Sequence, residues 1–279
     1  MADGGIKPEV ILSRVATSRR YRSVSDELIL RLANEEIPKS RNLADAEKRT
    51  KRRLHQVFGA YTGQPDYPSL LVRMAEAHEH GDDEALRTLC RTAMEQHAST
   101  RERLPILDRF YSEIVSITGT PRSIVDLACG LNPLALPWMG LSEDVRYVAC
   151  DIDSGLVGFV VGVLDLLGIE HRVELCDIVA APPAATCDVA LLLKSVPCLD
   201  QQDRATAARV LSAIDARHHV VTFPTQSLGG RGKGMARNYR TRFETLLVEL
   251  GWESRHVDEI ELPGELIYVM GDRRDEREA

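Results

Sequence analysis

Residues 123–138 read SIVDLACGLNPLALPW, and the rest of the chain is interpreted outward from them. The first six residues form a short apolar run between Pro121 and Gly130, which is typical of a buried parallel strand. Cys129 and Gly130 then form a tight turn, and Pro133 suits the first turn of a helix because no amide donor is needed there. A strand, a glycine turn and a helix start predict the ligand-binding edge of an open α/β sheet.

The composition of this turn restricts the ligand that we expect. Gly130 is the single glycine between residues 126 and 138, whereas turns that bind a dinucleotide carry three spaced glycines that approach the pyrophosphate. A ligand with a ribose and an adenine but no phosphate fits this turn better. S-adenosylmethionine (SAM) is the commonest ligand of that kind, and we expect it here.

Acidic residues follow the next two predicted strands. Asp151 ends the strand expected over residues 146–150, where a carboxylate in a doubly wound fold accepts hydrogen bonds from ribose hydroxyls. Asp177 ends the strand expected over residues 172–176, where it can accept a hydrogen bond from the adenine amino group. Asp153 is the alternative to Asp151, but it could equally cap the following helix.

SAM also carries a free carboxylate, which needs a cationic partner. Arg101 and Arg103 are both candidates, because a guanidinium can bind a carboxylate through two parallel hydrogen bonds. The residues themselves do not choose between the two arginines. Both could also be surface residues of a helix.

The chain divides into a helical part and a part in which strands and helices alternate. Apolar residues recur at helical spacing before residue 116, which predicts helices over 9–18, 25–34, 44–59, 69–80 and 82–97. Strands are expected over 123–128, 146–150, 172–176, 188–193, 218–223, 256–262 and 265–270, with a helix over 201–214. We therefore predict an α/β fold: an all-helical domain (1–115) followed by a Rossmann-like methyltransferase domain (116–279) with a seven-stranded mixed sheet.

The formal net charge of −7 is unevenly distributed. Residues 1–53 carry 13 Lys and Arg against 8 Asp and Glu, whereas residues 116–279 carry 16 against 24. Five of the six residues from 48 to 53 are cations, with no acid among them. A charge run can be a solvated helix face, but this density predicts contact with nucleic-acid phosphates through the side chains of Arg49, Lys51 and Arg52.

Several classes of protein are disfavoured by the sequence. No apolar run reaches the roughly 18 residues of a transmembrane helix, and residues 1–10 lack the apolar core of a signal peptide. The six cysteines form no CxxC pair, so neither a zinc site nor a disulfide framework is indicated. We expect a cytoplasmic protein that needs no metal and binds no membrane.

Seven runs, in matching order between Thr17 and Met270, carry a family resemblance. They are similar to the aminoglycoside-resistance 16S rRNA (guanine-N7) methyltransferases, and their order makes them more specific than a general SAM-binding turn. The runs are KRTKRRLHQVFGAY, HASTRERL, DLACGLNPLALPWMG, DIDSGLVGF, LLLKSVPCL, TFPTQSLGGRGKGM and GELIYVM.

The resemblance implies a helical domain that docks on the 30S subunit and a second domain that methylates N7 of a guanosine in helix 44 of 16S rRNA, which confers aminoglycoside resistance. By motif match, Arg103 would bind the SAM carboxylate, Asp151 the ribose and Asp177 the adenine. The remaining cofactor contacts would come from His97, Ala98, Ser99, Ala128, Gly130, Ile178, Leu193 and Gln202. The rRNA would be faced by Lys194, Arg231 and Lys233. We expect a monomer.

Guanine N7 carries a lone pair and no proton, so its methylation needs alignment rather than a general base, and we assign no catalytic residue. The base must leave its stack to be reached, and Trp138 and Phe223 could present a face to it, although core packing explains both. Two alternatives stay open: a small-molecule SAM methyltransferase with a helical lid, and a non-catalytic RNA-binding module.

Overall fold

The computed structural model describes residues 6–58, 65–142, 144–225 and 234–271. The strands are β1 (Ser123–Leu127), β2 (Arg146–Asp151), β3 (Glu170–Leu175), β4 (Thr186–Leu193), β5 (Asp215–Pro224), β6 (His256–Leu262) and β7 (Glu265–Gly271). The α-helices are α1 (Pro8–Ala16), α2 (Asp26–Glu36), α3 (Leu43–Val57), α4 (Tyr67–Glu79), α5 (Asp83–Met94), α6 (Ala98–Arg103), α7 (Leu107–Thr118), α8 (Leu136–Met139), α9 (Ser154–Leu166), α10 (Val196–Asp200), α11 (Thr206–Ser212) and α12 (Met235–Leu250). Short 3₁₀ helices are η1 (Ile37–Lys39), η2 (Leu104–Ile106) and η3 (Asn132–Ala135).

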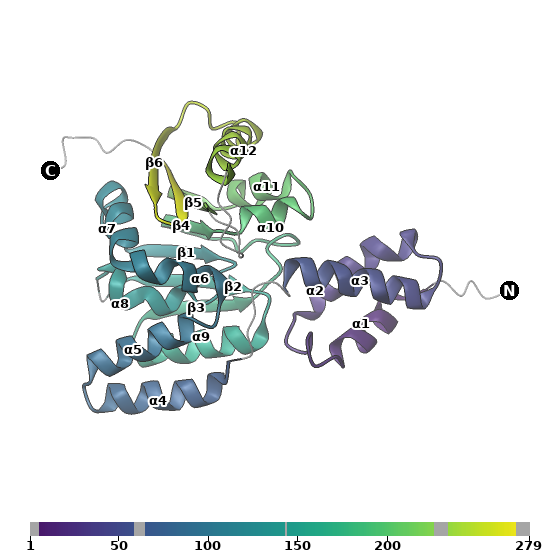
Figure 1. Ribbon diagram of the computed structural model, residues 1–279, viewed down its shortest axis with the longest axis horizontal. Coiled ribbons are helices and arrows are strands. Elements are labelled where there is room, and N and C mark those ends of the chain that lie inside the picture. The colour runs from purple at the N-terminus through teal and green to yellow at the C-terminus, as the bar shows by residue number, and fades with distance from the viewer. Residues whose placement is uncertain (1–5, 59–64, 143, 226–233, 272–279) are drawn as a thin grey trace.

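The strands form one seven-stranded sheet in the order β3-β2-β1-β4-β5-β7-β6 (Figure 1). β1 to β5 pair in parallel, and β7 lies antiparallel between β5 and β6. The expected α/β fold with a mixed sheet is therefore confirmed. The chain leaves β1 toward β2 on one side and returns to β4 on the other, which places a ligand-binding crevice at the carboxyl ends of these strands.

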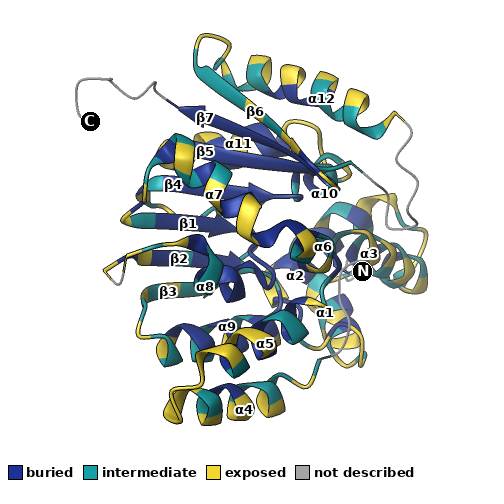
Figure 2. Ribbon diagram, turned by 60° about the vertical axis from the view of Figure 1, so that its left-hand side comes forward, coloured by how far each residue is buried: buried dark blue, intermediate teal, exposed yellow. Residues whose placement is uncertain are grey.

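Both faces of the sheet are covered, because alternate residues of a strand point to opposite sides. In β1, Ile124 packs into the cluster that also holds Phe110 of α7 and Val160 of α9. Its neighbour Val125 packs into the opposite cluster with Phe243 of α12. Figure 2 shows the inner strands as buried, whereas the outward faces of α4 and α12 are exposed.

The helical part of the chain divides between two hydrophobic cores. Helices α1, α2 and α3 have a cluster of their own, and we call these three helices the N-terminal lobe; in Figure 1 the lobe projects from one side of the sheet. Helices α4, α5 and α7 instead bury side chains such as Met74 and Phe110 in a cluster shared with the sheet. The boundary at residue 115 stays a prediction, while the packing favours a division between Phe58 and Tyr67.

Local signals explain most helix starts. Ser25 accepts a hydrogen bond from the amide of Leu28 at 3.2 Å and caps α2, and Asn42 caps α3 in the same way. The helix expected over 201–214 is shorter than predicted, because α11 begins at Thr206 after a turn. No helix in the described part of the chain combines the length and apolarity needed to cross a membrane.

Candidate cofactor-binding site

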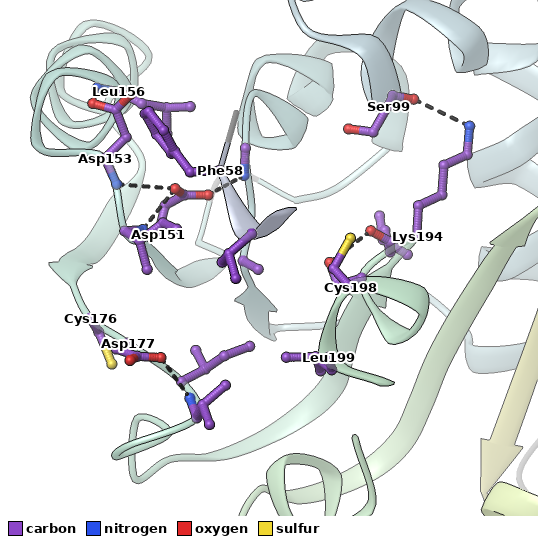
Figure 3. A pocket seen from close by; sticks show the side chains of 18 of the residues that line it. Phe58, Ser99, Asp151, Asp153, Leu156, Cys176, Asp177, Lys194, Cys198 and Leu199 are labelled. Carbon is purple, nitrogen blue, oxygen red and sulfur yellow. Dashed lines mark hydrogen bonds between the residues drawn. The ribbon is translucent and has the colours of Figure 1, made fainter. Parts of the chain in front are cut away.

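A hollow of about 850 Å³, measured with its open mouth, lies at the carboxyl ends of β1, β2 and β4 (Figure 3). The described lining comes from the segments after these strands and after β3, from the start of α6, from α10, and from Val57 and Phe58 at the end of α3. The N-terminal lobe therefore supplies part of the wall.

Asp151 connects the first two strand ends. Its Oδ2 accepts a hydrogen bond from the amide of Gly130 at 2.9 Å, and its Oδ1 accepts from the amides of Ile152 and Asp153 at 2.7 and 3.2 Å (Figure 3). Burial raises the pKa of Asp151 above its usual value, even though these three amides favour the ionised form. Three accepted hydrogen bonds leave one acceptor position, on Oδ2, for a ligand hydroxyl.

The turn at Gly130 favours a residue without a side chain. Gly130 has a φ of 50°, and a Cβ added there would lie 3.1 Å from Cε1 of His97. Burial, followed by the nearby Arg101 and Arg103, lowers the pKa of His97 to about 4. The imidazole against the turn is therefore neutral at physiological pH.

Asp177 and Gln202 line the pocket farther along its wall, and both are held by one arginine of the N-terminal lobe. Nε of Arg31 donates to Oδ2 of Asp177 at 2.6 Å, and Nη2 donates to Oε1 of Gln202 at 2.7 Å. The other oxygen of Asp177 accepts from the amide of Val179 at 3.1 Å. Sequence reasoning missed Arg31, because it lies 146 positions from Asp177 and belongs to no local motif.

Lys194 directly follows β4. Among the described lining residues, it is the only one that is a lysine or an arginine. Its side chain is 5% exposed, and Nζ lies 3.0 Å from Glu102 and 3.3 Å from Glu265. Nζ also donates to the carbonyl of Ser99 at 3.4 Å (Figure 3). Its backbone φ of 56° is uncommon for a residue with a side chain. The expected contact of Lys194 with rRNA stays a prediction.

Arg103 is outside the described lining of the pocket. Its Nε and Nη2 donate to both oxygens of Glu265, at 3.1 and 2.7 Å, and Nη1 donates to Asn132 at 2.9 Å. Burial raises the pKa of Glu265, but Arg103 and Lys194 outweigh burial and hold that pKa below its usual value. The expected role of Arg103 at the SAM carboxylate stays a prediction, since the guanidinium is already engaged by a buried anion.

Asp126 lies beneath the turn in a buried polar chain. Oδ2 accepts hydrogen bonds from the amide group of Asn132 at 2.9 Å and from the hydroxyl of Tyr147 at 2.7 Å. Oδ1 is buried and has no partner among the described residues. Burial raises the pKa of Asp126 to about 7, despite the two hydrogen bonds that lower it.

The structure brings most of the expected cofactor contacts to this hollow. Ala98 is the exception besides Arg103, because it is buried outside the described lining. Asp153 caps α9 by accepting from the amides of Gly155 and Leu156, so this alternative to Asp151 has the capping role. The expected residues that line the hollow are His97, Ser99, Ala128, Gly130, Asp151, Asp177, Ile178, Leu193 and Gln202.

The expected RNA-facing cations differ in their surroundings. Arg49 donates to Glu36 at 2.8 Å, and Lys51 donates to Glu47 at 2.7 Å. Arg52 is exposed. Arg231 and Lys233 lie outside the described residues.

Trp138 and Phe223 both pack against the core, as the sequence favoured over a place beside the target base. Trp138 is contacted by the guanidinium groups of Arg87 and Arg91, 5.4 and 5.3 Å from its ring centre, and Phe223 is fully buried. Neither belongs to the described lining, whereas Phe58 does. Phe58 was missed because an apolar residue at a helix end gives the same pattern as core packing.

The chain is similar to ribosomal RNA methyltransferases. Residues 17–269 match the model of a family described as ribosomal RNA methyltransferase (FmrO). A 16S rRNA (guanine(1405)-N(7))-methyltransferase of Micromonospora rosea is 46% identical over 92% of this chain and 93% of its own length. A protein of the same description from Serratia marcescens is 35% identical over 84% and 87%. The crystal structure of 16S rRNA methyltransferase RmtF with S-adenosyl-L-homocysteine has a TM-score of 0.82, with 34% identity over 98% and 99%.

Proposed function

Because the chain belongs to the FmrO family of ribosomal RNA methyltransferases, we propose that it methylates N7 of a guanosine in 16S rRNA with SAM as methyl donor. The target is a guanosine of helix 44 within the 30S subunit, and its methylation confers aminoglycoside resistance. The similar 16S rRNA methyltransferase RmtF was crystallised with S-adenosyl-L-homocysteine (SAH), which is what remains of SAM after methyl transfer.

The single observation that supports this proposal most strongly is the position of Asp151. Its carboxylate lies at the end of β2, tied to the Gly130 amide at the end of β1, and keeps one acceptor position for a ribose hydroxyl. The turn offers no set of glycine amides for a phosphate, which favours a nucleoside ligand over a dinucleotide.

The residues of the hollow suit the other parts of SAM. Asp177 offers acceptors to the adenine amino group, and Ile178 and Leu193 offer apolar surface to the ring. Arg103 and Lys194 are the cations proposed to bind the carboxylate of the cofactor. Both already form an ion pair with Glu265. When bound, SAM supplies an electrophilic methyl group on its sulfonium.

The chemistry asks the protein to align two partners rather than to move a proton. Guanine N7 presents a lone pair and carries no hydrogen, so no side chain has to act as a base. His97, which is neutral, packs closely against the Gly130 turn and forms a tight corner of the site. Their contribution is a fixed shape against which the nucleoside part of the cofactor is oriented.

The N-terminal lobe carries the cations for rRNA. Arg52 and Lys48 are exposed on α3, whereas Arg49 and Lys51 donate hydrogen bonds to Glu36 and Glu47. Phosphate contacts of this kind give affinity without base specificity. The lobe therefore docks the enzyme on the subunit, and the α/β domain selects the base.

The proposal is tested by incubating the full-length protein with isolated 30S subunits and SAM, followed by borohydride–aniline cleavage of the 16S rRNA. Scission at one guanosine of helix 44, read by primer extension, supports methylation at N7. A primer-extension stop without scission would place the methyl group on a Watson–Crick edge and overturn the assignment. Asp151→Asn serves as the loss-of-function control, and the exposed Asp165→Asn, 69% exposed on α9, as its matched control.

A further inference from the structure

Arg31 on α2 of the N-terminal lobe divides its guanidinium among three partners. Nε donates to Asp177, Nη2 to Gln202, and Nη1 to Glu35 one turn farther along its own helix at 2.7 Å. The Arg31 side chain is 18% exposed and that of Asp177 only 3%. A hydrogen-bonded ion pair that is largely removed from water holds its geometry better than an exposed one.

The same lobe meets the pocket at a second place. The amide of Ser25 donates to the carbonyl of Ile152 at 2.9 Å, and the amide of Ser154 donates to the carbonyl of Ser23 at 2.7 Å. These bonds lie directly after Asp151, the residue assigned to the ribose. The lobe is thus fastened to the α/β domain on both the ribose side and the adenine side of the hollow.

We propose that Arg31 is a positioning residue, which fixes Asp177 and Gln202 in the orientation that recognises the adenine of the cofactor. This inference rests on the proposed function, because it takes the nucleoside of SAM as the ligand. The lobe that docks on the ribosome then also completes the cofactor site.

The hydrogen-bonding groups define what Arg31 does to each partner. An arginine only donates, so it fixes the oxygen of Gln202 toward α2 and leaves the NH₂ group as the free end of the amide. Asp177 keeps acceptor capacity on both oxygens after the bonds from Arg31 and Val179. The pocket wall therefore offers a fixed acceptor and a fixed donor, which match the amino group and the ring nitrogens of adenine.

The test compares two ligands by calorimetry on the full-length protein without rRNA. SAH carries the 6-amino group of adenine, whereas S-inosyl-L-homocysteine carries an oxygen there and would face the Asp177 carboxylate with an acceptor. We expect the wild type to prefer SAH, and Arg31→Ala to lose about tenfold of this preference, as for one hydrogen bond to a charged group. Arg31→Lys should also lose part of the preference for SAH, because a single ammonium group lacks the planar pair of nitrogens that donate to Asp177 and Gln202.

Two further variants separate this role from simple stabilisation. Arg53→Ala removes another contact between lobe and domain, the 3.2 Å bond to the carbonyl of Gln201, together with ion pairs to Glu35 and Glu36 at 3.6 and 4.0 Å. None of these described contacts reaches a side chain of the pocket lining, so its preference should equal that of the wild type. Asp177→Asn should abolish the preference. Melting temperatures are measured for each variant to identify any that is unfolded. If Arg31→Ala is unfolded, the ligand preference of Arg31→Lys tests the positioning role instead.

The outcomes are distinct. If Arg31 variants bind both ligands more weakly in equal proportion, or retain the wild-type preference, the positioning role is overturned. The same holds if Asp177→Asn keeps full preference, because adenine then lies elsewhere. If the wild type binds neither ligand, the cofactor assignment in the proposed function fails instead.

Discussion

The carboxylate of Glu265 accepts two hydrogen bonds from the guanidinium of Arg103, although 162 positions separate them, and each side chain is 1% exposed. Glu265 also accepts from the hydroxyl of Thr222 at 2.7 Å and lies 3.3 Å from Nζ of Lys194. One anion at the start of β7 thus pairs with two cations beside the candidate cofactor site, and Glu102 is a second acidic partner of Lys194.

Removing that anion should destabilise the protein strongly. Glu265→Gln leaves two buried cations without their shared counter-charge, and breaking such a pair typically costs about 3–5 kcal/mol of unfolding free energy. Denaturant unfolding followed by circular dichroism measures the loss. Glu261→Gln, which removes the exposed partner of Arg240, is the control and should change little because water screens that pair. Equal losses in the two variants would contradict the assignment.

The pH dependence of stability should contain a contribution from Asp126. Burial raises its pKa to about 7 in the folded protein, while an unfolded aspartate has a pKa of about 4. The folded state therefore binds this proton more tightly, so the contribution is fully present below about pH 4 and is lost as the pH rises through about 7.

Asp126→Asn removes the titrating group and isolates this contribution. The difference in unfolding free energy between variant and wild type should move in favour of the variant as the pH rises from 5 to 8. Denaturant titrations at each pH measure it, and the difference cancels all other carboxylates. A difference that does not vary with pH would show that Asp126 stays ionised in the fold.

Gly130 and Gly168 allow backbone strain to be separated from a steric effect at the site. Both have positive φ, 50° and 66°, so replacement by alanine should cost about 1 kcal/mol of stability in each case. A Cβ at Gly130 would press on His97, whereas one at Gly168 meets nothing within 4 Å. Only Gly130→Ala should weaken SAH binding in calorimetry, and equal affinities in the two variants would argue against a cofactor at this turn.

The exposed Arg52 should contribute to subunit docking but not to cofactor binding. Arg52→Glu reverses a charge on α3, so we expect a raised KM for 30S subunits, a weaker salt dependence and unchanged SAH affinity. Methylation assays at several salt concentrations measure the first two. Arg209→Glu, whose side chain is 60% exposed on α11 of the other domain, is the matched reversal. If it raised KM equally, the effect would be one of net charge alone.

Local sequence features predicted the parts of the site that depend on local structure. The strand before the Gly130 turn and the acid at Asp151 follow from apolar runs that end in turn residues, and β2 extends only one residue beyond its expected range. The contacts of Arg31 with Asp177, of Lys194 with Glu102 and of Arg103 with Glu265 could not be predicted, because they join residues 92 to 162 positions apart and no periodicity records such pairs.

The predicted start of the helix over 201–214 was wrong for a related reason. Its first residues form the turn between α10 and α11, where Arg31 holds Gln202. Arg242 of α12 also binds Asp200 at 2.6 and 2.7 Å. These contacts come from segments that are distant in the sequence, and such tertiary contacts can override the helix propensity of an isolated segment.

The pairing of Arg103 with Glu265 has a consequence for biosynthesis. A nascent chain exposes Arg103 long before β7 leaves the ribosomal tunnel, at typical rates of about 5–20 residues per second. During that interval the guanidinium lacks Glu265, which accepts two of its hydrogen bonds, so burying it in the interior beside β1 carries the cost of a poorly compensated charge. Stable closure of the core around Arg103 is thereby expected to await translation of the β7 segment.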